Sequence, residues 1–202
     1  MTPYFDILFV IKQRNKKGNR VHATSQWRWV YDPDQQQLQI ELEQGLIHIA
    51  PYKASRLVPL HAMNAAFSME DAATFQSFYD ALEASQRLSP NVMFEAALNH
   101  TIYQRYGRPQ MPQSWYFQTA EVALDHEPEV GLLVRLNSGL ADVLCAVCSI
   151  EGEFVECMVL AELFPLSDIK SLRQFDVIKV MPNRLQPAFN QSKSTTETLR
   201  QA

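Results

Sequence analysis

The string Cys145-Ala146-Val147-Cys148 has the spacing of a zinc-binding or redox-active cysteine pair. It lies, however, in an apolar run that is typical of a β-strand, and residues three apart in a strand point to opposite faces of the sheet. The sequence has no second pair of this kind to complete four zinc ligands, and Cys157 makes the number of cysteines odd. We therefore expect buried, metal-free thiols in a reducing compartment, with no metal site and no disulfide framework.

The other residues that act as acids, bases or nucleophiles show no catalytic arrangement. The histidines are scattered along the chain, and His100 lies in an expected helix, where we predict a solvent-facing side chain. Acidic pairs occur at Glu127/Glu129 and Glu151/Glu153, but both flank turn residues, where carboxylates are normally solvated. Glycine-rich phosphate loops and nucleophile elbows are absent from the sequence. We predict no catalytic residues, no cofactor and no enzymatic activity.

Residues suited to protein binding occur around positions 107–115, where two prolines three apart prevent a helix or a central strand. This segment, which we call the connector, joins helical to strand-like sequence. Arg105 and Arg108 lie at its start and Trp115 at its end, while Lys179 and Arg184 come from near the end of the chain. Tryptophan and arginine often supply most of the energy of protein interfaces. We predict a binding surface here, although an aromatic residue at the start of an expected strand, such as Trp115, is also typical of a core.

Composition and charge restrict the possible partners. A chain of 202 residues that is 47% apolar is long enough to bury a core, as one large domain or two small ones. Residues 1–26 carry five basic residues against Asp6, a net charge of +4, so the rest of a chain of net charge −4 carries −8. So acidic a body binds nucleic acid poorly, because lysine and arginine provide most of that affinity. We expect no nucleic-acid partner.

The first residues do not resemble a signal for export. The apolar run at residues 4–11 precedes the basic cluster, which is the reverse of a secretory signal peptide. The run is also shorter than the ~20 residues needed to cross a bilayer. We predict a cytoplasmic protein without membrane insertion.

The hydrophobic pattern predicts the elements that position these residues. Alternating apolar residues predict strands at residues 27–32, 38–43 and 46–49. Ser68 and Asp71 have the spacing of a capped helix start, and Ser89-Pro90 begins a second helix that ends at Gly107. Four more strands are predicted at residues 132–136, 143–148, 154–160 and 175–180. We expect an α+β fold: an N-terminal α/β region of antiparallel strands plus two helices, followed by a C-terminal twisted β-barrel-like region.

The expected organisation has four parts. Residues 1–26 differ in charge from the body and precede the first aromatic strand, so we predict a flexible extension. An N-terminal α/β domain spans residues 27–108, and a C-terminal β-barrel-like domain spans residues 109–189. Residues 190–202 form a polar tail.

Three motifs together resemble the ZapC family of bacterial cell-division proteins. They are Trp27-Arg28-Trp29-Val30-Tyr31-Asp32, the connector Gly107-Arg108-Pro109-Gln110-Met111-Pro112-Gln113-Ser114-Trp115, and the stretch from Phe175 to Leu185. The resemblance covers roughly residues 27–189, and none of the motifs is a catalytic signature. It implies an N-terminal α/β region and a C-terminal barrel-like region, each with a pocket.

The resemblance also implies a function and a partner. ZapC-like proteins are non-enzymatic accessory proteins that bind the globular core of the tubulin-like protein FtsZ, promote lateral bundling of its filaments and stabilise the division ring. For this chain we therefore expect direct FtsZ binding and a cytoplasmic location at midcell. No small-molecule substrate is expected.

Site residues are implied in the same way. Arg108, Trp115, Lys179 and Arg184 match basic and aromatic positions of the family's FtsZ-binding surface, and Arg105 adjoins them. Ile40 matches the apolar pattern that lines the N-terminal pocket. Gln113 stands where the family can have lysine, which implies a weaker basic rim. The alternative is a small-ligand-binding or enzymatic barrel domain that uses a cleft at the connector, and co-sedimentation with polymerised FtsZ separates the two readings.

Overall fold

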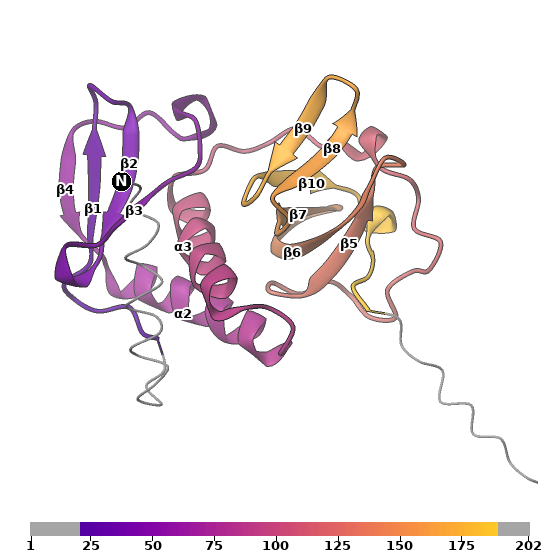
Figure 1. Ribbon diagram of the computed structural model, residues 1–202, viewed down its shortest axis with the longest axis horizontal. Coiled ribbons are helices and arrows are strands. Elements are labelled where there is room, and N and C mark those ends of the chain that lie inside the picture. The colour runs from indigo at the N-terminus through magenta and orange to yellow at the C-terminus, as the bar shows by residue number, and fades with distance from the viewer. Residues whose placement is uncertain (1–20, 190–202) are drawn as a thin grey trace, which may run out of the picture.

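A computed structural model describes residues 21–189, which form three layers: a four-stranded sheet, a pair of helices and a five-stranded sheet (Figure 1). The predicted α+β class is confirmed. Residues 1–20, which include most of the predicted extension, and the tail from residue 190 lie outside the described part. The packed chain begins earlier than expected, because Val21 is already buried in the core.

The first sheet contains β1 (Arg28–Asp32), β2 (Gln37–Glu41), β3 (Ile47–Ile49) and β4 (Met63–Ala66). Its order is β3-β2-β1-β4, and every pairing is antiparallel. The predicted alternation is confirmed, since Trp29 and Ile40 face each other across the ladder and both are completely buried. The sequence analysis missed β4, whose Met-Asn-Ala-Ala sequence has no alternating pattern and becomes a strand by pairing with β1.

Two helices follow, α2 (Met69–Ala84) and α3 (Pro90–Tyr106). The predicted capping box is confirmed: Ser68 Oγ accepts from the Asp71 amide at 3.1 Å, and Asp71 Oδ2 accepts from the Ser68 amide at 2.7 Å. Gly107 follows α3 as predicted, but with φ of −66°. A Cβ at this position would lie 2.5 Å from the Tyr103 carbonyl oxygen, so close approach of the backbone requires the glycine.

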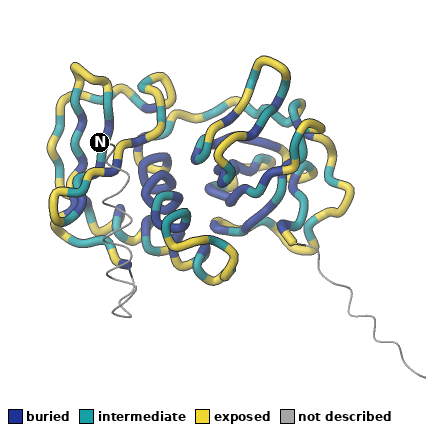
Figure 2. The backbone as a smooth tube through the Cα atoms, in the orientation of Figure 1, coloured by how far each residue is buried: buried dark blue, intermediate teal, exposed yellow. Residues whose placement is uncertain are grey.

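Helix α3 is the centre of the molecule (Figure 2). Every residue from Ala96 to Tyr103 is buried, which is typical of a helix covered on all sides. Asn99 Oδ1 lies 3.0 Å from His48 Nε2 in the first sheet, whereas His100 Nε2 lies 3.1 Å from the Cys148 carbonyl oxygen in the second. The predicted solvent-facing His100 is therefore wrong. Its ring stacks on Phe78 at 3.9 Å, because both faces of the helix are covered.

The second sheet has the order β10-β7-β6-β5-β11. The strands of this half are β5 (Leu133–Asn137), β6 (Asp142–Glu151), β7 (Phe154–Val159), β8 (Leu163–Ser167), β9 (Lys170–Arg173), β10 (Val177–Val180) and β11 (Gln186–Pro187). The predicted barrel-like closure is wrong: β10 and β11 end the sheet without pairing to each other, and β8 and β9 pair as a separate hairpin. The sheet instead buries one face against α3 and the other against the hairpin (Figure 1).

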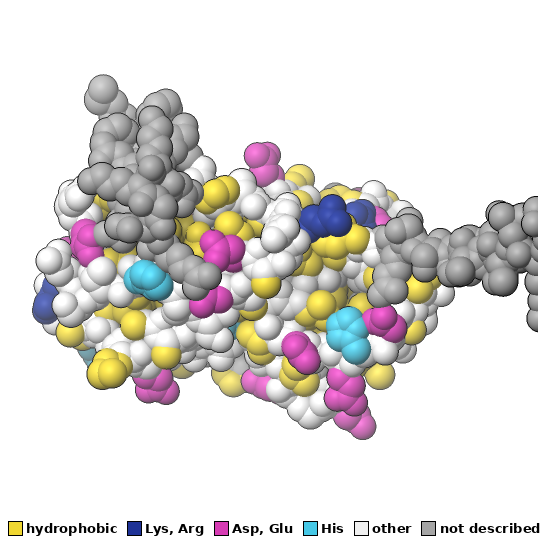
Figure 3. Space-filling view, turned by 90° about the horizontal axis from the view of Figure 1, so that it is seen from below, with side chains coloured by type: hydrophobic (Ala, Val, Ile, Leu, Met, Phe, Trp, Pro, Cys, Tyr) yellow, Lys and Arg dark blue, Asp and Glu magenta, His cyan; other side chains and the backbone are white. Residues whose placement is uncertain are grey.

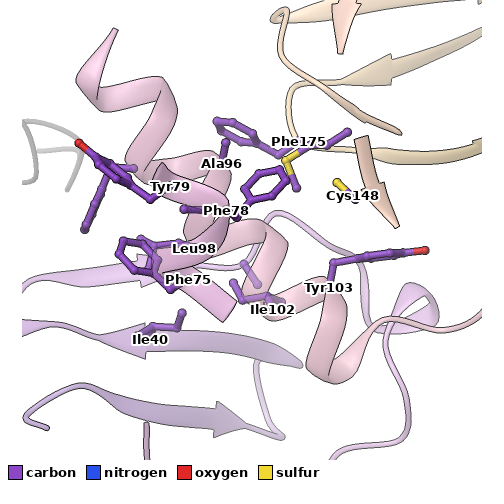
Figure 4. Packing of buried hydrophobic residues seen from close by; sticks show 14 of the residues in the cluster. Ile40, Phe75, Phe78, Tyr79, Ala96, Leu98, Ile102, Tyr103, Cys148 and Phe175 are labelled. Carbon is purple, nitrogen blue, oxygen red and sulfur yellow. The ribbon is translucent and has the colours of Figure 1, made fainter. Parts of the chain in front are cut away.

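Both halves share one core. The cluster around Trp29 and Ile102 also contains Cys148, Met158 and Phe175 from the second half of the chain. In Figure 4, Ile102 lies between α3 and Ile40, while Phe78, Cys148 and Phe175 lie on the opposite side of the helices. The packing therefore joins the two sheets through the helical layer.

Within residues 21–189, four short 3-10 helices lie in the loops: η1 (Glu43–Gly45), η2 (Ala54–Arg56), η3 (Ser114–Tyr116) and η4 (Pro182–Arg184). The sequence analysis expected a strand to begin at Trp115, but this residue lies in η3. Two features favour a turn here: Pro112 lies just before it, and the Gln113 amide donates a hydrogen bond to the Lys179 carbonyl oxygen in β10.

Candidate binding surface at the connector

The connector is anchored at both ends by backbone hydrogen bonds. At its start, the Arg108 amide donates to the Arg56 carbonyl oxygen at 2.9 Å. At its end, the Gln113 amide donates to the Lys179 carbonyl oxygen at 2.8 Å, and Ser114 Oγ accepts from the Met181 amide at 2.9 Å. The segment is thus irregular but fixed to its neighbours, as a rigid connector must be.

This anchoring holds large apolar side chains in solvent. Trp115 is 71% exposed and Met111 79% exposed, and Met181, beside Ser114, is also exposed. The hypothesis that Trp115 is a core residue is therefore wrong. The Tyr116 ring packs against the Trp115 ring, with ring centroids 5.7 Å apart. We call Met111, Trp115 and Met181 the connector surface.

Lys170 adds positive charge beside this surface. Its Nζ donates to Gln113 Oε1 at 2.6 Å and lies 4.3 Å from the centroid of the Tyr116 ring. Gln113 thus holds the Lys170 ammonium group beside the connector. The sequence analysis missed Lys170, because β9 supplies it from 57 residues farther along the chain.

Arg108 and Arg184 differ in their surroundings. Arg108 is exposed at the start of the connector, and no hydrogen bond or ion pair holds its side chain among the described residues. Arg184 is half-buried in η4 and donates from Nη1 to Thr119 Oγ1 at 2.5 Å.

Arg105 and Lys179 are held by carboxylates. Arg105 lies on α3, where its Nη1 pairs with Asp71 at 2.5 Å. Lys179 is only 8% exposed, and its Nζ lies 2.5 Å from Glu151 and 4.0 Å from Glu156. These interactions fix the two cations within the fold.

Ile40 lies apart from this group. It is completely buried in β2, on the side of the sheet that faces α3 (Figure 4). Its role in an N-terminal pocket stays a prediction, as does the role of the five predicted FtsZ-binding residues.

A small polar pocket lies beside the connector. It has a volume of about 100 Å³ and is lined by residues that include Tyr103, Arg108, Pro109 and Glu156. Burial raises the pKa of Glu156, while the Tyr103 hydroxyl and Lys179 act in the opposite direction. The volume is below the ~300 Å³ at which ligand pockets usually start. The pocket therefore gives little support to a metabolite-binding cleft at the connector.

The cysteines lie as the alternation predicted. Cys145 packs in the core between the second sheet and the hairpin, whereas Cys148 packs in the core against α3. The strand register shifts between Val147 and Ser149, so Cys148 lies at a β-bulge. Among residues 21–189, no group of His, Cys, Asp or Glu is arranged to hold a metal ion.

We expect the three thiols to be unreactive in the folded protein. Burial raises the pKa of Cys145, Cys148 and Cys157, so little thiolate forms at neutral pH, and all three are free and inaccessible. In titration with a thiol-specific reagent, the folded protein should show negligible labelling over minutes, and urea-unfolded protein should release all three at once. Rapid labelling of one thiol in the folded state, or stoichiometric zinc by elemental analysis, contradicts this expectation.

The fold and this surface define the class of protein: an α+β protein with two sheets on a shared helical layer and an exposed aromatic surface at the junction. No helix in residues 21–189 has the length and apolar character to cross a membrane. Residues 20–108 match the family model "Cell-division protein ZapC, N-terminal", and residues 109–191 match "Cell-division protein ZapC, C-terminal". The chain belongs to the ZapC family.

Curated relatives agree with this assignment. A protein named "Cell division protein ZapC" from Idiomarina loihiensis is 40% identical over 169 residues, which cover 83% of this chain and 91% of the relative. Proteins of the same name from Shewanella woodyi and Shewanella frigidimarina are 34% and 35% identical, each over 80% of this chain, and 88% and 90% of their own lengths are covered.

Proposed function

We propose that this chain is a non-enzymatic cell-division protein that binds FtsZ directly in the cytoplasm at midcell. Membership of the ZapC family supports a role in division. The partner follows from the resemblance of the three sequence motifs. The same proposal includes lateral bundling of FtsZ filaments by this chain, and this bundling would stabilise the division ring.

The observation that carries the proposal is the exposed Trp115 on an anchored support. A tryptophan that stays in solvent gains a large buried area when a partner covers it, and it loses little conformational freedom if its backbone is already fixed. Lys170 and Arg108 provide positive charge on this side of an otherwise acidic body. Figure 3 shows Asp and Glu side chains scattered over one face of the molecule, with Lys and Arg in only two places.

The position of the cations suits an acidic partner. FtsZ, the partner that the resemblance implies, is acidic, and residues 27–202 of this chain carry a net charge of −8, so the two repel at long range. A local basic rim reduces that repulsion where the surfaces meet. We propose Met111, Trp115 and Met181 as the apolar centre of the docking site, with Arg108 and Lys170 on its rim. Lys179 and Arg184 stabilise the edges of this site through their hydrogen bonds to Gln113 and Thr119.

Trp115→Ala should weaken FtsZ binding by about 2 kcal/mol, roughly thirtyfold, because it removes the largest exposed apolar side chain of the surface. Arg108→Glu should weaken it by about 1 kcal/mol, roughly fivefold, as expected for a charge on the rim. Dissociation constants and co-sedimentation with polymerised FtsZ measure both effects, and light scattering measures bundling.

The chain offers matched controls for both changes. Leu140→Ala removes an exposed apolar side chain in the β5–β6 turn, and Arg87→Glu makes the same charge reversal at the opposite end of α3. Both controls should retain the wild-type affinity. If Trp115→Ala and Arg108→Glu bind as tightly as the controls, the docking site lies elsewhere; if wild-type protein does not bind FtsZ, the proposed partner is wrong.

A further inference from the structure

The connector carries two glutamines, and each of them holds a cation from another part of the chain. Arg56 Nη1 donates to Gln110 Oε1 at 2.5 Å, and Lys170 Nζ donates to Gln113 Oε1 at 2.6 Å. An amide oxygen is neutral, so it fixes a cation without cancelling the charge, whereas a carboxylate forms a neutral pair. Arg56 lies in η2, in the first half of the chain, and so brings a positive charge to the connector from a different half than Lys170.

The backbone of Arg56 is fixed to the connector as well. Its carbonyl oxygen accepts from the Arg108 amide at 2.9 Å, and the next residue, Leu57, forms an antiparallel bridge with Gly107. The Arg56 side chain is nevertheless exposed. A side chain that is held in place before binding loses less conformational freedom when a partner contacts it.

A buried hydrogen-bond chain determines which end of the Gln110 amide faces Arg56. The Glu156 carboxylate is only 3% exposed and accepts from the Tyr103 hydroxyl. Lys179 Nζ lies 4.0 Å from this carboxylate and favours its ionised form. Because the Tyr103 proton is used in this way, the Tyr103 oxygen accepts from Gln110 Nε2, at 3.4 Å. Gln110 Oε1 is then the atom that remains for Arg56.

Arg56 keeps its charge, unlike the cations that the fold neutralises. Arg105 and Lys179 pair with carboxylates, whereas no ion pair among residues 21–189 includes Arg56. Within this part of the chain its guanidinium donates only from Nη1, so Nε and Nη2 are left to donate together to one carboxylate from outside. Such a cation on an acidic body attracts a carboxylate of a partner.

We propose that Arg56 is a further residue of the FtsZ docking site and donates there to a carboxylate of the partner. This inference rests on the proposed function and extends it, because it adds the first half of the chain to a surface that otherwise comes from the connector and the second half. Gln110 acts as a positioning residue, since it holds Arg56 at the position that precedes the exposed Met111. The docking site then has cations from both halves of the chain.

Arg56→Glu should weaken FtsZ binding about fivefold at low salt, because it reverses the charge that faces the partner. Arg56→Lys keeps the charge but loses the planar guanidinium, so it should weaken binding about twofold. The loss for Arg56→Glu should shrink as the salt concentration rises, since exposed charges are screened. Dissociation constants at two salt concentrations measure these effects, and melting temperatures equal to that of the wild type check that the variants are folded.

Lys53→Glu is the matched control. Lys53 is exposed in the same loop, and no hydrogen bond or ion pair within the described chain holds its side chain. The same charge reversal there should weaken binding less than about twofold. Equal losses for Arg56→Glu and Lys53→Glu, or a loss for Arg56→Glu that salt does not change, overturn the inference while the wild-type protein still binds FtsZ. If the wild-type protein does not bind FtsZ, the proposed function fails and this inference fails with it.

Gln110→Glu tests the positioning role. A carboxylate at this position pairs with Arg56 and cancels its charge, so FtsZ binding should weaken about threefold. Gln86→Glu adds the same charge at an exposed position between α2 and α3 and should have little effect. In an Arg56→Gln background, Gln110→Glu should weaken binding no more than Gln86→Glu does. A full threefold loss in that background overturns the positioning role.

The hydrogen-bond chain also has a readout that needs no partner. Tyr103→Phe removes the hydroxyl, so the side-chain amide signals of Gln110 should shift in NMR spectra of the full chain. The signals of Gln113, whose amide binds Lys170, should stay in place. Unchanged Gln110 signals show that Tyr103 does not orient this amide and overturn the chain, whatever the FtsZ titrations give.

Discussion

Lowering the pH from 7 to 4 is expected to reduce the free energy of unfolding by about 3 kcal/mol for each of two buried histidines. Burial lowers the pKa of His48 and of His100 to about 4, although hydrogen bonds to Asn99 and to the Cys148 carbonyl oppose the shift. In the unfolded chain, a histidine takes up its proton near pH 6.5. Between these values the unfolded state binds more protons, so stability falls as the pH falls.

The stability is undiminished by this effect above about pH 6.5, and most of the loss has occurred by about pH 4. Burial raises the pKa of Glu95 and Glu156, so these residues act in the opposite direction and reduce the net loss. Urea unfolding at several pH values measures the dependence. His48→Gln should remove roughly half of the loss, while the exposed His61→Gln serves as the control. A stability that is flat from pH 6.5 to 4.5 in wild-type protein contradicts the expectation.

Asp71→Ala is expected to destabilise the protein by about 3 kcal/mol, because it removes several partners of buried or capping groups at once. Its Oδ2 accepts from Trp29 Nε1 at 2.9 Å and from the Ser68 amide at 2.7 Å, and the carboxylate pairs with Arg105. Trp29 is completely buried, so its indole N–H has no access to water after the change. The Arg105 pair contributes the least, since that side chain is 38% exposed.

Two variants make this expectation specific. Asp71→Asn keeps one acceptor oxygen and should lose less stability, about 1–2 kcal/mol. Glu70→Ala, at the preceding position in the same helical turn, removes an exposed carboxylate and should lose no more than about 1 kcal/mol. Chemical denaturation with a constant m-value measures all three. Equal losses for Asp71→Ala and Glu70→Ala indicate that only the general charge at the helix start matters.

The elements that the sequence predicted well are those whose signals are local. Alternation in β1 and β2, the Ser68–Asp71 capping box and the glycine after α3 each depend on neighbours in the chain. The missed strand β4 depends on a distant partner, because it exists by pairing with β1. Strands β8 and β9 were missed although their hairpin is local, and they pair with each other rather than with the second sheet.

The candidate site shows the same division. The connector and its exposed Arg108 follow from the two prolines, whose effect on the backbone is local. The groups around Trp115 do not, because Lys170 binds Gln113 and Met181 binds Ser114 from far along the chain. Lys179 appeared as a free cation in the sequence, but Glu151 and Glu156 lie beside it in the fold. Nothing local predicted the burial of His100, which results from a second sheet that covers α3.

Helix α3 has a consequence for how such a chain can change during evolution. Its residues 96–103 are buried because they serve as interior wall for both sheets, so neither half has a complete core without them. The two family models that match the chain meet between Arg108 and Pro109, but the two parts are not interchangeable modules. A graft that moved only residues 109–189 onto another protein would carry an uncovered apolar sheet face with it. The smallest transferable unit is therefore the pair of sheets together with the helix that they share.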